Sequence, residues 1–157
     1  MPTSAPDATG PLIDHILSRY HDRHRDTLPD LAALALKVER VHGDSPDVPT
    51  GLGAVIEDVS RALDLHMQKE ELMLFPVMQA GPSPVLAMRI AVMRADHHDI
   101  HARVAQIGTL TANLTLPDHA CRSWRDLYQG LAEFIADLNE HMRLEDDVLF
   151  PRFIPAG

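Results

Sequence analysis

The stretch at residues 66–76, "HMQKEELMLFP", returns at residues 141–151 as "HMRLEDDVLFP". Each copy places a glutamate four residues after a histidine, in the pairs His66/Glu70 and His141/Glu145. Side chains at i and i+4 lie one above the other on the same face of a helix. Each copy can therefore present a nitrogen and an oxygen side by side, and the repeat predicts two helices that each contribute half of one site.

The hydrophobic pattern around this repeat predicts an all-α protein. Apolar residues recur at i, i+3, i+4 and i+7, and the alternation typical of strands is absent. Segments rich in glycine, proline and polar residues at 42–51, 80–84 and 115–121 divide the pattern into four helices. Connections of about 5 to 10 residues make successive helices antiparallel neighbours. We therefore expect an antiparallel up-down-up-down four-helix bundle.

The first helix contains Pro29, which removes a backbone donor and can kink or restart a helix. The apolar stripe from Leu17 to Val38 keeps its phase across the proline, which favours one long helix bent at that point. We expect residues 1–10 to form a flexible N-terminus and residues 11–157 to form a single domain.

The composition narrows the class of protein. A net charge of −9 without any basic run argues against binding to nucleic acid or to anionic lipid. The chain shows no signal peptide, and no apolar run approaches the roughly 20 residues that span a bilayer. Cys121 is the single cysteine, which excludes an internal disulfide, and we expect a small, half-buried side chain there. We expect a cytoplasmic protein with no membrane association.

The polar residues of the repeat continue an apolar stripe, which indicates that they point inward. At an offset of 75 residues the stripes align as follows: Leu52 with Leu127, Ile56 with Leu131, Val59 with Phe134, Leu63 with Leu138, then His66 with His141 and Glu70 with Glu145. At an offset of 76, His21 of the first helix corresponds to His97 of the third. Buried imidazoles and carboxylates are costly unless they are paired or bind a metal. The chain thus resembles two similar helical hairpins that face a shared cation site.

The depth of the histidines along the bundle supports this site. His66 and His97 lie about 14 and 13 residues from the turn between them, hence roughly 20 Å from it at 1.5 Å per residue. His97 and His141 also lie at similar distances from the loop that joins their helices. The distances of His21 and His66 from the first loop agree less closely. His42 opens the first loop, roughly 20 to 30 Å away by helix rise. We therefore expect His42 on the surface and not among the ligands.

Other histidines have different expected roles. His101 follows His97 by four residues, so we expect it on the same face as a further ligand. His24 follows His21 by three residues and is either a ligand or a residue that packs against one. The remaining histidines are expected to be solvated or to cap helices: His15, His98 and His119.

The ligand types favour two metal ions. The predicted ligands are His21, His66, Glu70, His97, His101, His141 and Glu145. A mononuclear zinc site would need only two or three histidines with one acid, whereas six positions with paired acids suit two octahedral ions. Carboxylate bridges hold such ions about 3.5 to 4 Å apart. We expect both ions to be iron. Glu71 and Asp146 rotate off the inner face, where they are solvated or fix imidazole tautomers.

Longer segments resemble a known family. The His-x-x-x-Glu pattern followed by Leu-Phe-Pro on two helices resembles the hemerythrin-like, or HHE cation-binding, domain. The closest resemblance is to the C-terminal domain of the di-iron iron–sulfur cluster repair proteins, the RIC family. It rests on the segments "IDHILSRYHDRHRDTLPDLAALALKVERVHGD", "HMQKEELMLFPVM", "ACRSWRDLYQGL" and "EHMRLEDDVLFPR". The similarity extends over residues from about 11 to 153.

The resemblance implies a hemerythrin-like di-iron domain over residues 11–157. It implies an oxo-bridged and carboxylate-bridged pair of iron ions, with the four histidines His21, His66, His97 and His141 as terminal ligands and Glu70 and Glu145 as bridges. His101 is similar to the paired histidines on the third helix of oxygen-binding hemerythrins. Proteins of the repair family carry a short N-terminal domain with adjacent cysteines, whereas this sequence begins directly at the bundle.

Three functions fit such a centre. The resemblance favours a stress-response protein that reacts with nitric oxide and assists iron–sulfur cluster repair, with iron–sulfur proteins as partners. The alternative is a protein that reversibly binds or senses oxygen or nitric oxide. A di-iron oxidase or peroxidase is disfavoured, because oxygen-activating bundles of the ferritin type use carboxylate-rich motifs. The sequence leaves open whether the chain is an enzyme, and it assigns no oligomeric state.

Overall fold

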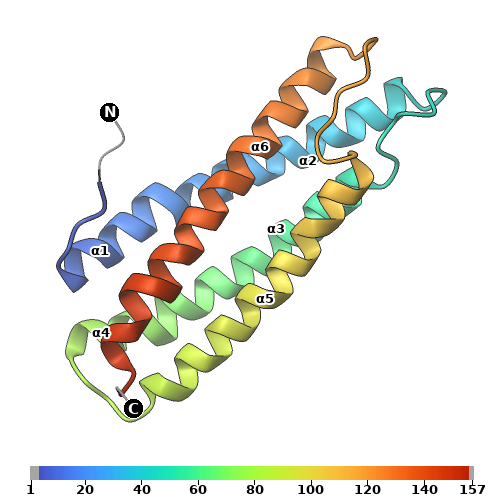
Figure 1. Ribbon diagram of the computed structural model, residues 1–157. Coiled ribbons are helices and arrows are strands. Elements are labelled where there is room, and N and C mark those ends of the chain that lie inside the picture. Colours follow the sequence, from blue (N-terminus) through green and yellow to red (C-terminus); the bar gives the residue numbers. More distant parts are fainter. Residues whose placement is uncertain (1–3, 156–157) are drawn as a thin grey trace.

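The computed structural model describes residues 4–155, and every regular element in that part of the chain is helical. The helices form four rods (Figure 1). The first rod consists of α1 (Thr9–Ile16), the π-helical turn η1 (Leu17–His21) and α2 (Asp22–Val41). The second consists of α3 (Leu52–Lys69), the π-helical turn η2 (Glu70–Leu74) and α4 (Phe75–Ala80). The third is α5 (Leu86–Leu110), and the fourth consists of α6 (Arg122–Arg143), the π-helical turn η3 (Leu144–Leu149) and the 3-10 turn η4 (Phe150–Phe153).

The rods alternate in direction, and loops at 42–51, 81–85 and 111–121 join them at the two ends of the bundle (Figure 1). α2 packs against both α3 and α6, and α3 packs against α5. The predicted antiparallel four-helix bundle is therefore confirmed. Within the described residues, none of the helices has the length and apolar character needed to cross a membrane.

The first rod begins earlier than expected and runs without a break. Its helix starts at Thr9, inside the segment that was predicted to be flexible, and Ala5 packs against the apolar core. Residues 1–3 of that segment lie outside the described residues. Pro29 lies on the exposed side of α2, and the helix continues through it to Val41. The prediction of one long first helix is thus confirmed.

Glycines let α2 lie close to two neighbouring rods. A Cβ atom added to Gly53 of α3 would lie 2.5 Å from Leu36 Cδ2, and one added to Gly130 of α6 would lie 2.6 Å from Leu31 Cδ2. A methyl group at either position would displace the end of one of these leucine side chains. The two glycines therefore make room for leucines of α2 against the second and fourth rods.

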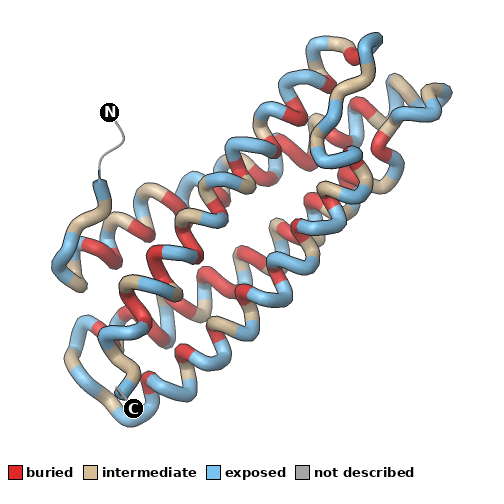
Figure 2. The backbone as a smooth tube through the Cα atoms, viewed as in Figure 1, coloured by how far each residue is buried: buried red, intermediate tan, exposed pale blue. Residues whose placement is uncertain are grey.

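Buried residues follow the inner faces of the helices along the bundle (Figure 2). The apolar ones form two clusters, with polar side chains between them. One cluster includes Leu63, Met67, Ile100 and Leu138, and the other includes Leu74, Met93 and Leu144. All eight apolar residues of the aligned stripes are at most 2% exposed, as the repeat predicted: Leu52, Ile56, Val59, Leu63, Leu127, Leu131, Phe134 and Leu138. The histidines and glutamates of the repeat lie between the clusters, where water does not reach them.

Candidate metal centre

Six of the seven predicted ligand residues meet in the polar layer. They come from all four rods: His21, His66, Glu70, His97, His141 and Glu145. None is more than 2% exposed. Their positions on the chain span more than 120 residues, so only the bundle brings them together.

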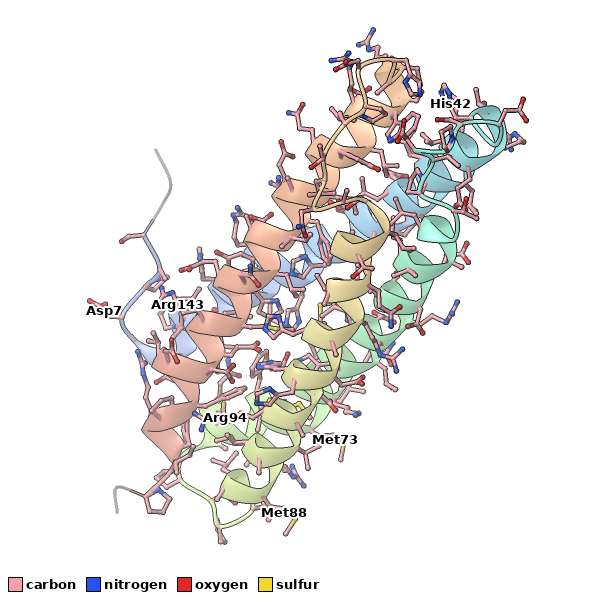
Figure 3. The ribbon with its side chains drawn as sticks, turned by 45° about the vertical axis from the view of Figure 1, so that its right-hand side comes forward. Asp7, His42, Met73, Met88, Arg94 and Arg143 are labelled. Carbon is pink, nitrogen blue, oxygen red and sulfur yellow. The ribbon has the colours of Figure 1, made fainter. Side chains whose placement is uncertain are left out.

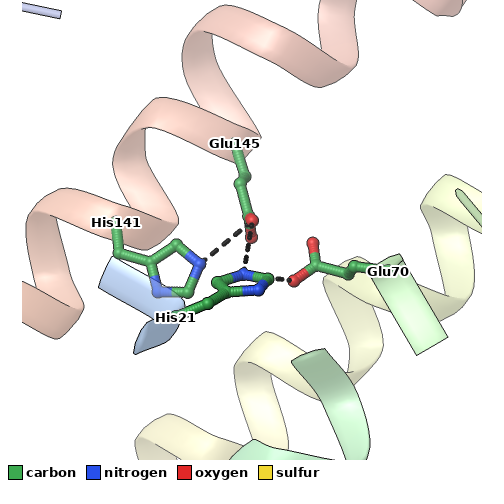
Figure 4. A group of neighbouring side chains, drawn as sticks. All are labelled: His21, Glu70, His141 and Glu145. Carbon is green, nitrogen blue, oxygen red and sulfur yellow. Dashed lines mark hydrogen bonds and ion pairs between the residues drawn. The ribbon is translucent and has the colours of Figure 1, made fainter. Parts of the chain in front are cut away.

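The six side chains form two overlapping groups that share both glutamates. His21 and His141 form the first half of the centre with Glu70 and Glu145, as Figure 4 shows. His66 and His97 form the second half with the same two glutamates. In each half, one ligand atom from every residue lies within 4.8 Å of the others. The arrangement is that of two adjacent cation positions with two carboxylates in common.

Glu145 faces both halves with different oxygens. In the first half, Oε2 of Glu145 lies 3.0 Å from His141 Nε2 and 3.9 Å from His21 Nε2. In the second half, Oε1 lies 3.0 Å from His97 Nε2 and 4.0 Å from His66 Nε2. A carboxylate placed in this way can bind one cation through each oxygen.

Glu70 reaches both halves through a single oxygen. Its Oε1 lies 3.4 Å from His21 Nε2 and 3.2 Å from His66 Nε2. Within the second half, Nε2 of His66 and Nε2 of His97 are only 3.1 Å apart. Two imidazole nitrogens and two carboxylates therefore surround each position.

Unsatisfied polar atoms concentrate in this cluster. Six buried side-chain nitrogen or oxygen atoms in residues 4–155 have no hydrogen-bond partner, and four of them belong here: His21 Nε2, Glu70 Oε1, Glu70 Oε2 and Glu145 Oε1. Each such atom costs about 1 to 3 kcal/mol when it stays unsatisfied, and more if it is charged. A cation would satisfy all four at once, and imidazole with carboxylate is a suitable donor set for first-row metals such as iron, zinc and copper. The residues present therefore fit a pair of metal ions.

The outer ring nitrogens hold the histidines in place. Nδ1–H of His21 donates to Glu71 at 2.7 Å, and Nδ1–H of His97 donates to Asp146 at 3.0 Å. The predicted roles of Glu71 and Asp146 as partners of imidazole rings agree with these contacts. With the proton on Nδ1, each Nε2 offers its lone pair to the interior of the cluster.

Two further residues contact outer ring nitrogens: Asp96, which the sequence did not reveal, and His24, which the sequence left as either a ligand or a residue that packs against one. Nδ1–H of His66 donates to Asp96 at 3.2 Å, and Nδ1 of His141 lies 3.1 Å from Nε2 of His24. His24 is buried but lies behind a cluster residue, so the structure places it as a partner of His141 and not inside the cluster. Asp96 directly precedes the predicted ligand His97. This adjacency is the sequence feature from which a role for Asp96 beside the cluster could have been predicted.

The cluster perturbs its histidines strongly. Burial alone would lower the pKa of His21, but the nearby carboxylates of Glu145 and Glu70 outweigh burial and raise the pKa to about 10. The pKa of His97 rises to about 10 in the same way, because contacts with Asp146 and Glu145 outweigh burial. Burial, together with the charges of nearby histidines, lowers the pKa of His24 to about 3. Without a metal, the raised pKa values of His21 and His97 favour protonated rings beside the buried carboxylates.

The three π-helical turns of the structure all lie at the centre. His21 ends η1, Glu70 begins η2, and Glu145 is the second residue of η3. A π turn inserts one extra residue into a helix and is often found at functional sites. The irregular turns therefore adjust the direction of three of the six side chains, and the regular periodicity assumed from the sequence did not reveal them.

The Leu-Phe-Pro part of the repeat places an aromatic ring on a histidine. Phe75 stacks on His21 with ring centroids 5.8 Å apart, and Phe150 stacks on His97 at 6.0 Å. Both phenylalanines are at most 2% exposed. Each copy of the repeat thus supplies a histidine, a glutamate and a phenylalanine. The phenylalanine stacks on a histidine of the preceding rod.

The structure does not place His101 in the cluster, and the expectation that it shares the face of His97 is wrong. The buried positions of α5 advance by four and three residues in turn: Met93, His97, Ile100, Val104 and Ile107. This spacing is the core pattern of packed helices. The inner face therefore passes from His97 to Ile100, and His101 is exposed.

Replacing His101 with alanine is accordingly expected to leave metal binding intact. The variant should bind as much iron per chain as the parent, and its free energy of unfolding should change by less than about 0.5 kcal/mol, as is usual at exposed positions. Metal analysis after anaerobic loading with Fe²⁺ measures the first quantity, and urea denaturation measures the second. A loss of half the iron would restore His101 to the ligand set.

His42 lies at the end of the bundle, at the first loop (Figure 3). Its Nε2 is 3.1 Å from Sγ of Cys121, and its ring lies 5.0 Å from that of Trp124. Cys121 is half-buried and immediately precedes α6, as the sequence predicted. Of the other histidines, His98 and His119 are exposed as expected, and His15 is half-buried against Tyr20.

Replacing His42 with alanine is expected to leave the metal centre unchanged, because its imidazole contacts Cys121 and Trp124 instead of the cluster. The absorption spectrum of the iron-loaded variant should match that of the parent in band position and intensity per iron. A shifted or missing band would show that His42 influences the centre over a distance that these contacts do not explain.

Comparison with known proteins agrees with this geometry. The family model "Hemerythrin HHE cation binding domain" matches residues 12–153. Proteins named "Iron-sulfur cluster repair protein YtfE" from Yersinia pseudotuberculosis serotype O:1b (strain IP 31758) and Yersinia pestis (strain Pestoides F) are 49% and 48% identical to this chain over 141 residues. The matched region covers 90% of this chain and 64% of the length of each relative. The chain therefore belongs to the hemerythrin HHE cation-binding domain family.

Proposed function

We propose that the domain holds two iron ions, one in each half of the centre, and reacts through them with nitric oxide during nitrosative or oxidative stress. The observation that carries this proposal is the sharing of both glutamates between two groups of buried histidines. The proposed ligands are His21, His66, Glu70, His97, His141 and Glu145. His101, which is exposed, is left out of this set.

The residues of the chain would perform three tasks around the metal pair. The four imidazoles are neutral donors, and their outer hydrogen bonds fix the ring nitrogen that faces inward. The two carboxylates neutralise part of the metal charge and, with an oxo bridge as implied by the family, hold the ions close together. When bound, the iron pair supplies electrons and a position for a diatomic ligand. The complete burial of the ligands excludes bulk water and admits only small molecules.

The relatives suggest the biological use of this chemistry. Proteins 48–49% identical to this chain carry the name iron–sulfur cluster repair protein. We infer that this domain likewise assists the repair of iron–sulfur clusters, with iron–sulfur proteins as partners. The chain spans 64% of the length of those relatives, so the domain would supply the di-iron part of that activity.

A second candidate function is reversible binding or sensing of oxygen or nitric oxide. The observation that favours it is the ligand set: four imidazoles with only two carboxylates, all buried. Oxygen-activating bundles instead use a carboxylate-rich set. A centre of this composition suits the binding of a diatomic gas at least as well as its conversion.

An anaerobic titration of the reduced, iron-loaded protein tests both candidates. Nitric oxide and oxygen are added separately while the absorption spectrum is recorded. Consumption of several equivalents of nitric oxide per centre supports the stress-response function. A stable oxygen adduct that disappears under vacuum supports reversible binding. Iron that neither gas perturbs would exclude both.

A further inference from the structure

The outer ring nitrogens of the four histidines meet unequal partners. Three donate to a carboxylate: His21 to Glu71 at 2.7 Å, His66 to Asp96 at 3.2 Å and His97 to Asp146 at 3.0 Å. Nδ1 of His141 instead meets Nε2 of His24, a second imidazole, at 3.1 Å. The second half of the centre therefore has two histidines backed by carboxylates, whereas the first half has one.

The contact between His141 and His24 determines where the protons lie. For Nε2 of His141 to offer a lone pair to a cation, its ring proton must be on Nδ1. That N–H then donates to Nε2 of His24, which can accept only as a neutral imidazole. His141 thus has an uncharged acceptor behind it.

The internal repeat explains the difference. At the offset of 76 residues, Asp96 of α5 corresponds to Tyr20 of η1. Asp96 accepts the outer proton of His66, but Tyr20 stacks on the ring of His141 with centroids 5.5 Å apart. The position that supplies a carboxylate to the second half therefore supplies an aromatic ring to the first.

The acid one turn before His141 does not replace the missing carboxylate. Asp137 accepts hydrogen bonds from Arg19 at 3.0 and 3.3 Å, and Arg23 Nε lies 3.0 Å from it. Two arginines therefore hold this carboxylate on the outer side of α2 and α6. Among the described residues, His24 is the hydrogen-bond partner of His141 Nδ1.

Nearby cations increase the difference between the halves. Each of the three outer carboxylates has a cation nearby, but the contacts differ in number and distance. Arg25 donates two hydrogen bonds to Glu71, at 2.8 and 3.0 Å, and Lys69 donates one to Asp96, at 3.1 Å. Arg94 Nε lies 3.8 Å from Asp146. The carboxylate that backs the first half is the one most fully engaged by a cation. Its effect on the imidazole of His21 is correspondingly reduced.

A carboxylate behind a metal-binding histidine makes the ring a stronger donor, and loss of such a partner costs roughly 10- to 100-fold in metal affinity or activity. We propose that the two cation positions are unequal, and that the position between His21 and His141 releases its ion first while the position between His66 and His97 retains its own. This inference rests on the metal pair proposed above. It assigns to the first half the exchangeable iron that the domain could pass to a partner.

Two surface hollows lie beside His24, the residue behind His141. A hollow of about 80 Å³ between α2 and α6 is lined by His24 and Phe134, and one of about 300 Å³ between α2 and α3 is lined by His24 and Met67. His24 thus separates His141 from the surface on both sides of α2.

The test locates the ion that remains after one has been removed. The chain is loaded anaerobically with Fe²⁺, treated with increasing chelator until one iron per chain remains, and crystallised for anomalous diffraction at the iron edge. Release should occur in two steps whose midpoints differ by about 10-fold or more in free chelator concentration. The remaining iron should lie between His66 and His97. Iron between His21 and His141, or equal occupancy of both positions, overturns the proposal.

Matched variants test the cause. Asp146→Asn replaces a carboxylate behind His97 with a neutral amide. The ratio between the chelator concentrations at the two release midpoints should therefore fall several-fold. His24→Gln keeps a neutral acceptor at about the position of Nε2 behind His141 and should preserve the separation. Asp96→Asn serves if Asp146→Asn does not fold, as judged by circular dichroism of the metal-free chain. An unchanged separation in the folded Asp-to-Asn variant contradicts the proposal.

The outcomes separate this inference from the proposed function. A parent chain that takes up no iron counts against the metal centre itself. A parent chain that binds two irons and releases them in one step counts against unequal positions alone.

Discussion

Replacing Glu70 with leucine is expected to abolish the binding of both metal ions. Glu70 belongs to both halves, and neither of its oxygens has a hydrogen-bond partner within residues 4–155. Removal of this carboxylate takes one ligand and one negative charge from each position. Iron content, measured after anaerobic loading and gel filtration, should fall from two per chain to near zero.

The metal-free variant should be less stable than the metal-free parent. Glu70 Oε1 lies 3.4 and 3.2 Å from Nε2 of His21 and His66, and its charge raises the pKa of both rings. Removing one partner of a buried ion pair is destabilising by about 3 to 5 kcal/mol. Urea denaturation of both metal-free chains measures this. Glu57→Leu is the matched control, because Glu57 is an exposed glutamate on α3. Retention of two irons by Glu70→Leu would contradict the bridging role.

Removing the metal from the parent chain is expected to lower its thermal stability strongly. A cation that binds only the folded state stabilises it by about 4 kcal/mol at a free concentration 1,000 times its dissociation constant. For a domain of this length, 1 kcal/mol shifts the midpoint by about 2 to 4 °C. Chelation should therefore lower Tm on the order of 10 °C, as measured by calorimetry with and without chelator.

The Glu70→Leu variant provides the control for this experiment. Because the variant is expected to bind no metal, its Tm should be the same with and without chelator. If the chelator lowers the Tm of both chains equally, it acts on something other than the centre. If it leaves the parent unaffected, the cluster is stable without a cation and the four unsatisfied atoms need another explanation.

Much of the fold and most of the candidate site could be predicted from periodicity. The stripe that contains Leu63 and Leu138 repeats at a fixed offset, and a helix translates that offset into a shared face. His66 and Glu70 follow the same stripe, so their burial could be predicted together with that of the leucines. The depth argument also held for His42, because the rise of a helix per residue is constant.

The errors arose where packing, not periodicity, sets the direction of a side chain. His101 is four residues from His97, but the inner face of α5 passes to Ile100 because packed helices advance by three and four residues in turn. Likewise, His24 could be a ligand or a supporting residue on spacing alone. Its final position behind His141 depends on the rotation of α2 relative to α6, which no local pattern encodes.

The sequence by itself determined the four helices, their antiparallel order and the inward direction of the six histidines and glutamates of the candidate site, because these depend on local periodicity and on lengths measured along the chain. Only the tertiary structure decided how the ligands divide into two halves, which groups back each histidine and where the π turns redirect side chains. The groups that back the histidines depend on contacts between residues 30 to 117 positions apart, such as His66 with Asp96 and His24 with His141. Such contacts form only when separate helices pack at particular angles and distances.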